Sequence, residues 1–155
     1  MSEKKLPIQH TTPQDAILAK ENGVLREWVL EYLKIEGNDG LAAALEEHSG
    51  VLVDIVEFPL TELKKIEGPE PVSDRESLDR WEQRVLSIEK LIHQGQELPP
   101  LIVTDYWNPL EIADGNHRHE AFLRRGIEKY WTIFFIQDEA NKKKLLSFQG
   151  KHDEQ

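Results

Sequence analysis

Hydrophobic residues in the first 50 positions recur at helical spacing. Between residues 24 and 35 the apolar side chains fall at i, i+3, i+4, i+7 and i+8, which predicts an amphipathic helix. Residues 13–22 and 41–48 are two shorter segments of helical character, the first ending at Asn22 before Gly23 and the second followed by Ser49-Gly50. The first 50 residues therefore predict a helical appendage.

From residue 51 onward, short apolar runs typical of strands appear. Residues 51–58 are β-branched and roughly alternating, and residues 101–104 and 110–113 flank the turn residues Asn108-Pro109. This spacing predicts a hairpin, so the sheet is not purely parallel. Residues 130–136 form a nearly continuous apolar run, which predicts a central strand covered on both faces.

Helical patterns separate these strands. A long amphipathic helix follows a capping-box pattern at Ser73 and Glu76, and a shorter helix ends at Gly126. Alternation of strands and helices predicts an α/β (α+β) domain with a small mixed sheet and flanking helices. The predicted organisation is a helical appendage over residues 1–50, an α/β domain over 51–148 whose last helix covers 138–148, and a polar tail over 149–155.

Composition narrows the classes of function. The net charge of -10 and pI near 5.1 disfavour nucleic acid or an anionic membrane as partner, because neutralising phosphates requires clustered Lys and Arg. No apolar run approaches the roughly 20 residues needed to span a bilayer, and the N-terminus lacks the apolar core of a signal peptide. The absence of cysteine excludes disulfides, thiolate metal sites and a cysteine nucleophile, and it fits a cytoplasmic protein.

The stretch Asp114-Gly115-Asn116-His117-Arg118 carries the main candidate chemistry. It joins a short strand to the start of a helix, where free backbone N–H groups and the helix dipole favour an anion. Arg118 adds a planar guanidinium that suits phosphate or carboxylate. A plain structural role also remains open, in which Asp114 or Asn116 caps the helix and Gly115 supplies a turn.

Histidine and tryptophan positions raise two further questions. His117 and His119 lie two residues apart, so on a helix they point to different faces and are poorly placed to share one metal ion. A Mg²⁺ ion held through a carboxylate and nucleotide phosphates is the better metal hypothesis, since it needs few protein ligands. Trp28, Trp81 and Trp131 lie in apolar runs and are expected to pack in the core.

The order of these motifs resembles the ParB/sulfiredoxin superfamily. The resemblance covers about residues 51–137. The motifs that carry it are a proline-led strand at Leu98–Val103, the box at Asp114–Arg118, then Gly126 and another strand. Sulfiredoxins carry a reactive cysteine where this chain has Asn116, which excludes their sulfinic-acid reduction. Chromosome-partition ParB proteins carry G-E-R-R and bind CTP. The box shares most with the D-G-H-H-R branch, which includes free-serine kinases, and differs from it at Asn116 alone.

The resemblance implies a nucleotide- or phosphate-binding domain that acts as a phosphotransferase on a small hydroxyl-bearing molecule. ATP or ADP, with CTP as an alternative, and Mg²⁺ are the implied cofactors. Gly115, Asn116, His117 and Arg118 would hold the phosphate, and His117 would also orient the nucleophile. Glu57, at the end of the first strand, is the preferred general base, with Asp114 the second catalytic carboxylate.

Two other classes of function stay open. One is a non-catalytic nucleotide-sensing or protein-interaction module, for which the N-terminal helices would provide a homodimer or partner surface. The other is a DNA-binding or nuclease-type ParB-like protein, which the acidic composition disfavours.

Overall fold

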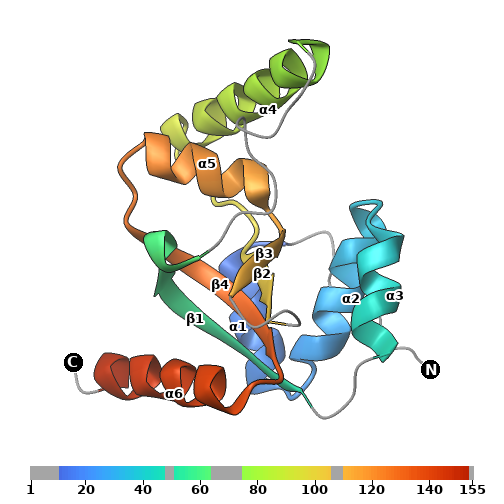
Figure 1. Ribbon diagram of the computed structural model, residues 1–155, viewed down its shortest axis with the longest axis vertical. Coiled ribbons are helices and arrows are strands. Elements are labelled where there is room, and N and C mark those ends of the chain that lie inside the picture. Colours follow the sequence, from blue (N-terminus) through green and yellow to red (C-terminus); the bar gives the residue numbers. More distant parts are fainter. Residues whose placement is uncertain (1–10, 48–50, 64–74, 106–109, 154–155) are drawn as a thin grey trace.

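The computed structural model describes residues 11–47, 51–63, 75–105 and 110–153 (Figure 1). The cap predicted at Ser73 and the turn predicted at Asn108-Pro109 lie outside these ranges. The described elements are, in order, α1 (Pro13–Glu21), α2 (Leu25–Ile35), α3 (Asp39–Glu47), β1 (Leu52–Pro59), the 3₁₀ helix η1 (Leu60–Glu62), α4 (Arg75–His93), β2 (Leu101–Thr104), β3 (Glu111–Asp114), α5 (Asn116–Arg124), β4 (Lys129–Ile136) and α6 (Glu139–Asp153).

The four strands form one mixed sheet in the order β1-β4-β2-β3. β4 pairs antiparallel with β1 and parallel with β2, while β2 and β3 form an antiparallel pair. The predicted hairpin, the central position of residues 130–136 and the mixed α+β class are therefore confirmed. β4 is central because its run from Thr132 to Ile136 is buried on both faces and suits no edge position.

Helices cover both faces of this sheet (Figure 1). On one face, Trp28 and Tyr32 of α2 belong to the same buried cluster as Ile102 and Ile133 of the strands. On the other face, Phe122 of α5 belongs to a second cluster with further strand residues. The N-terminal helices thus share a hydrophobic core with the sheet, and an ion pair between Lys20 Nζ and Asp54 Oδ1, 2.6 Å long, joins α1 to β1.

Two helices differ in length from the sequence prediction. α3 begins at Asp39, two residues early, because the Asn38 carbonyl accepts the first helical hydrogen bond from Ala42 N at 3.1 Å. α6 continues to Asp153, through residues predicted as a polar tail. Residues 149–153 carry no apolar pattern, so the loss of that pattern after residue 148 did not mark the end of the helix.

Candidate functional site

A cavity of about 680 Å³ lies where three parts of the fold meet. Its walls are the start of α5 at Gly115–Arg118, the middle of α4 at Arg84–Ile88, and the α2–α3 turn at Glu36–Asn38. This volume is within the range of about 300–1,000 Å³ that is typical of small-molecule sites. The box predicted from the sequence therefore opens into a space large enough for a ligand.

Gly115 makes the sharp change of direction from β3 into α5. Its φ of +109° is left-handed, and a Cβ atom there would lie 2.6 Å from Leu101 Cδ2 and 2.9 Å from Arg118 Nη2. Glycine is therefore required twice, by the backbone conformation and by the close approach. As the N-cap of α5, Gly115 supplies no side-chain hydrogen bond, so the first-turn N–H groups of the helix are uncapped by this residue.

Arg118 is held in place by the protein and is also exposed to the cavity. Its Nη2 donates to the Pro100 carbonyl at 3.0 Å and to Asp114 Oδ2 at 3.2 Å. Burial alone would lower the pKa of Arg118, but Tyr32 and Asp114 outweigh it, so the net direction is upward and the guanidinium stays charged. Among the described residues neither Nη1 nor the buried Nε has a hydrogen-bond partner.

A bulge in β3 determines which way Asp114 points. Ile102 pairs with Asp114 while Val103 pairs with Ile112, so Ala113 is an extra residue in the ladder. Without it, Asp114 would lie on the same face as Ile112, away from α2, because side chains alternate along a strand. The bulge turns Asp114 toward α2, where it accepts hydrogen bonds from Tyr32 and Asn38 in addition to Arg118.

The two histidines of α5 have separate surroundings. His117 lines the cavity and packs on the indole of Trp81, with 4.3 Å between ring centroids. His119 is buried, and its Nε2 donates to the Leu60 carbonyl at 2.8 Å, which fixes α5 to η1. They point away from each other, as their spacing predicted. Among the described residues, no group of three or more His, Asp and Glu side chains could hold a metal ion.

The structure separates the two carboxylates that the sequence proposed as catalytic. Asp114 lines the cavity, together with Gly115, Asn116, His117 and Arg118. Glu57 does not: it lies on β1, the opposite edge of the sheet, three strand spacings or roughly 14 Å away. A general base must come within hydrogen-bond reach of its proton. Glu57 therefore cannot act directly on a molecule bound at the box.

Sequence reasoning missed several residues of the cavity. Arg84 of α4 is an exposed cation that has no ion pair among the described residues, and Glu36 is an exposed carboxylate on the facing wall. Tyr32 and Asn38 reach Asp114 from α2 and from the turn after it. Of these residues, only Arg84 could have been suspected from the sequence, because it lies one helical turn after Trp81. Both residues lie on the side of α4 that meets α5. The others depend on long-range packing.

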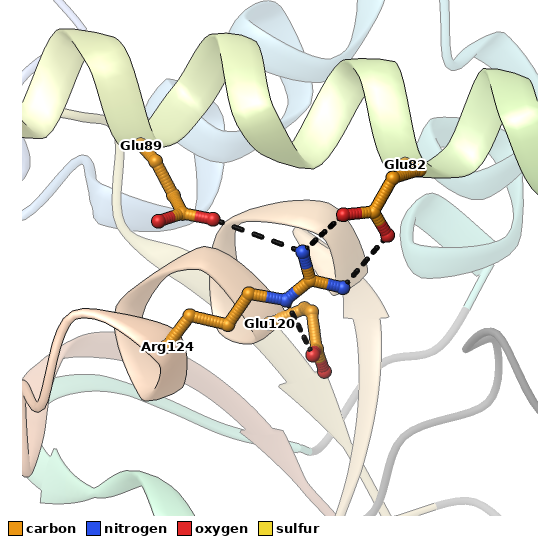
Figure 2. Close-up of polar contacts among 4 residues, drawn as sticks. All are labelled: Glu82, Glu89, Glu120 and Arg124. Carbon is orange, nitrogen blue, oxygen red and sulfur yellow. Dashed lines mark hydrogen bonds and ion pairs between the residues drawn. The ribbon is translucent and has the colours of Figure 1, made fainter.

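Arg124 fixes α4 against α5 and so fixes two walls of the cavity (Figure 2). It donates to Glu82 at 2.5 and 2.9 Å and to Glu120 at 2.9 Å, and it lies 3.8 Å from Glu89. Hydrogen bonds to Glu82 and Glu120 raise the pKa of Arg124, and the bond from Arg124 lowers the pKa of Glu82. One guanidinium thus contacts three carboxylates, two on α4 and one on α5, and joins the helix pair.

Replacing Arg124 with methionine should destabilise the protein in a pH-dependent way. At neutral pH we expect a loss of about 1 kcal/mol, because the network is partly exposed and screened. The folded-state pKa of Glu82 is depressed, so its contribution is present above the ordinary value of 4.5 and is lost as pH falls through the lower folded value. The loss caused by Arg124→Met should therefore shrink below pH 4.5.

Urea unfolding at neutral and acidic pH measures this difference. Lys142→Met is the matched control, since it removes one exposed ion pair with Glu139 from α6. A loss for Arg124→Met that is the same at both pH values would show that ion pairing is not its cause.

Comparisons with known proteins find similarity to solved structures alone. No family model matches the sequence, and no curated protein matches it. The structure is similar to a sulfiredoxin from Arabidopsis thaliana, at 19% identity and TM-score 0.42, over 60% of this chain and 97% of that one. It is also similar to a Pnob8-like ParB-N domain, at 16% identity and TM-score 0.37, over 60% of this chain and 33% of that one.

These two solved structures bear the names of the two branches that the sequence resembles, a sulfiredoxin and a ParB-N domain. The free-serine kinase branch stays a prediction. None of the helices in the described ranges is long and apolar enough to cross a membrane.

Proposed function

We propose that the chain binds the phosphate groups of a nucleotide at the start of α5. The observation that carries this proposal is the N-terminus of α5, where the N-cap Gly115 supplies no side-chain cap and the first turn lines the cavity together with Arg84. Backbone N–H groups and the helix dipole favour an anion at such a position. The two arginines would supply charge-assisted hydrogen bonds to phosphate oxygens.

The charges around the cavity favour a small anion. Asp114 is already paired with Arg118, so among the described residues that line the cavity the remaining positive groups are Arg84 and the N-terminus of α5. Glu36 lies on the facing wall. Together with a net charge of -10, this local arrangement suits one nucleotide better than a nucleic acid backbone.

Phosphoryl transfer to a small hydroxyl compound would extend this binding function. It needs a carboxylate close to the acceptor, and both oxygens of Asp114 already accept hydrogen bonds. Glu36 is the exposed carboxylate of the cavity and would take the hydroxyl proton. ATP would supply the phosphoryl group. Mg²⁺ would bind chiefly through the nucleotide phosphates, since the described residues offer no three-ligand cluster.

A non-catalytic nucleotide-binding module is the second candidate. The observation that favours it is the engagement of Asp114 by three donors, which suits a structural role better than proton transfer. ADP release from ATP in the presence of small hydroxyl compounds separates the two functions. Free serine is the first acceptor to test, because the sequence resemblance suggests it.

Calorimetric titration of the folded protein with ATP, ADP, CTP and pyrophosphate, with and without Mg²⁺, tests the binding proposal. Binding of at least one of these anions is expected. Arg84→Met should weaken it about tenfold, the effect of losing one exposed charge-assisted hydrogen bond. Stability should be unchanged, because Arg84 has no ion pair among the described residues.

Lys90→Met is the matched control for Arg84→Met. It removes an exposed cation from the same helix but not from the cavity wall, so it should leave the affinity near that of the wild type. No binding of any of the four anions by the folded wild type would overturn the proposal. Equal effects of the two substitutions would show that only overall charge matters.

A further inference from the structure

Two side chains from the N-terminal helices reach into the box. The Tyr32 hydroxyl donates to Asp114 Oδ2 at 3.3 Å, and Asn38 Nδ2 donates to Asp114 Oδ1 at 3.3 Å. Both residues precede the part of the chain that resembles the ParB/sulfiredoxin superfamily. The Asp114 carboxylate, at the end of β3, is therefore held by residues of a segment that lies outside that resemblance.

Packing fixes the position of the Tyr32 hydroxyl before any ligand binds. The ring is 1% exposed and stacks on Trp28, with 5.5 Å between centroids and 9° between planes. Burial is the main cause that raises the pKa of Tyr32, and the neighbouring Asp114 carboxylate adds to it. The hydroxyl thus stays protonated and remains a donor.

The α2–α3 turn fixes Asn38 in a similar way. Gly37 adopts a φ of +83°, and the Asn38 N–H donates to the Leu33 carbonyl at 2.8 Å. The Asn38 carbonyl accepts from Ala42 N at 3.1 Å, at the start of α3. The backbone of Asn38 is anchored on both sides, so its amide is directed at Asp114.

Asp114, held by these two residues, in turn orients Arg118. Its Oδ2 accepts from both Tyr32 and Arg118, so the hydroxyl and the guanidinium share one oxygen. With Nη2 occupied by Asp114 and Pro100, the orientation of the guanidinium plane is set. Rigid support of this kind preserves the alignment that a bidentate contact with phosphate requires.

We infer that Tyr32 and Asn38 are positioning residues of the phosphate site, which act through Asp114 to orient Arg118. The N-terminal helices therefore complete the site, and the α2–α3 turn forms one of its three walls. This inference rests on the proposed phosphate binding. It assigns no contact between Tyr32 and the ligand.

Titration with pyrophosphate tests the inference. Tyr32→Phe removes one hydroxyl and should weaken binding about fivefold, as for loss of a single hydrogen bond that orders a charged group. Asn38→Ala removes the other donor and should act in the same direction. Lys20→Met is the control, because it loosens α1 from β1 through the Asp54 ion pair without touching Asp114, and it should keep wild-type affinity.

A double-mutant cycle separates positioning from general structural support. In an Arg118→Lys background, which keeps the charge but loses the planar fork, Tyr32→Phe should cause no further loss of affinity. Tyr32→Phe should also shift the NMR resonance of Arg118 Nε–H, whereas Lys20→Met should not.

Full additivity in the cycle, or wild-type affinity in both Tyr32→Phe and Asn38→Ala, would overturn this inference alone. No pyrophosphate or nucleotide binding by the wild type would overturn the proposed function and this inference with it.

Discussion

Replacing Arg118 with methionine should abolish nucleotide binding and lower the free energy of unfolding by about 2–3 kcal/mol. The stability loss is expected because Asp114, 18% exposed, would lose its cation and the buried Pro100 would lose a donor to its carbonyl. It should stay below the roughly 3–5 kcal/mol typical of fully buried pairs, since solvent reaches both side chains. This result differs from the sequence-based view, in which Arg118 serves the ligand alone.

A second variant separates the two effects of Arg118. Asp114→Asn in the Arg118→Met background removes the uncompensated charge, so stability should recover while binding stays lost. Urea unfolding gives the stability, and calorimetric titration with ATP gives the affinity. Recovery of binding together with stability would show that Arg118 supports the fold and does not contact the ligand.

Gly115→Ala should cost about 3 kcal/mol of stability and most of the phosphate affinity. A left-handed conformation costs a non-glycine residue about 1–2 kcal/mol, and overpacking adds a similar amount. The new Cβ would meet Leu101 Cδ2 at 2.6 Å and Arg118 Nη2 at 2.9 Å. The substitution thus strains the turn and displaces the guanidinium from its partners.

Gly126→Ala provides a closely matched control. Gly126 also has a left-handed φ, +76°, but a Cβ atom there would meet nothing within 4 Å. Gly126→Ala should therefore lose only the stability that backbone strain costs, and it should leave ligand affinity unchanged. Thermal unfolding and ATP titration of both variants give the comparison. Equal losses of stability in the two, with affinity intact, would show that the close approach at Gly115 has no functional role.

Much of the fold could be predicted because local pattern and burial agree. The nearly continuous apolar run of residues 130–136 predicted an interior strand, and the structure places β4 there. Where burial no longer constrains the sequence, prediction failed: the polar residues 149–153 carry no periodicity, yet they continue α6. The early start of α3 depends on one backbone hydrogen bond at Asn38, which no pattern reveals.

The candidate site was predictable on one wall only. Gly115 and Arg118 could be identified because a strand, a glycine turn and a helix start are consecutive in sequence. Tyr32 and Arg84 lie on other helices, and only the packing of these helices brings them near the box. Glu57 was assigned as the acid at the end of the first strand, and the sequence does not reveal the order of the strands in the sheet. β1 runs at the far edge of the sheet, so its end lies away from the cavity.

The most direct test of phosphate binding at the start of α5 is an NMR titration of ¹⁵N-labelled wild-type protein with ATP and Mg²⁺. We expect the largest amide shifts at residues 115–118, with smaller shifts in the α2–α3 turn and at Arg84. Saturating ATP that leaves these amides unchanged, or that shifts only residues outside the cavity, would contradict a phosphate site at the start of α5.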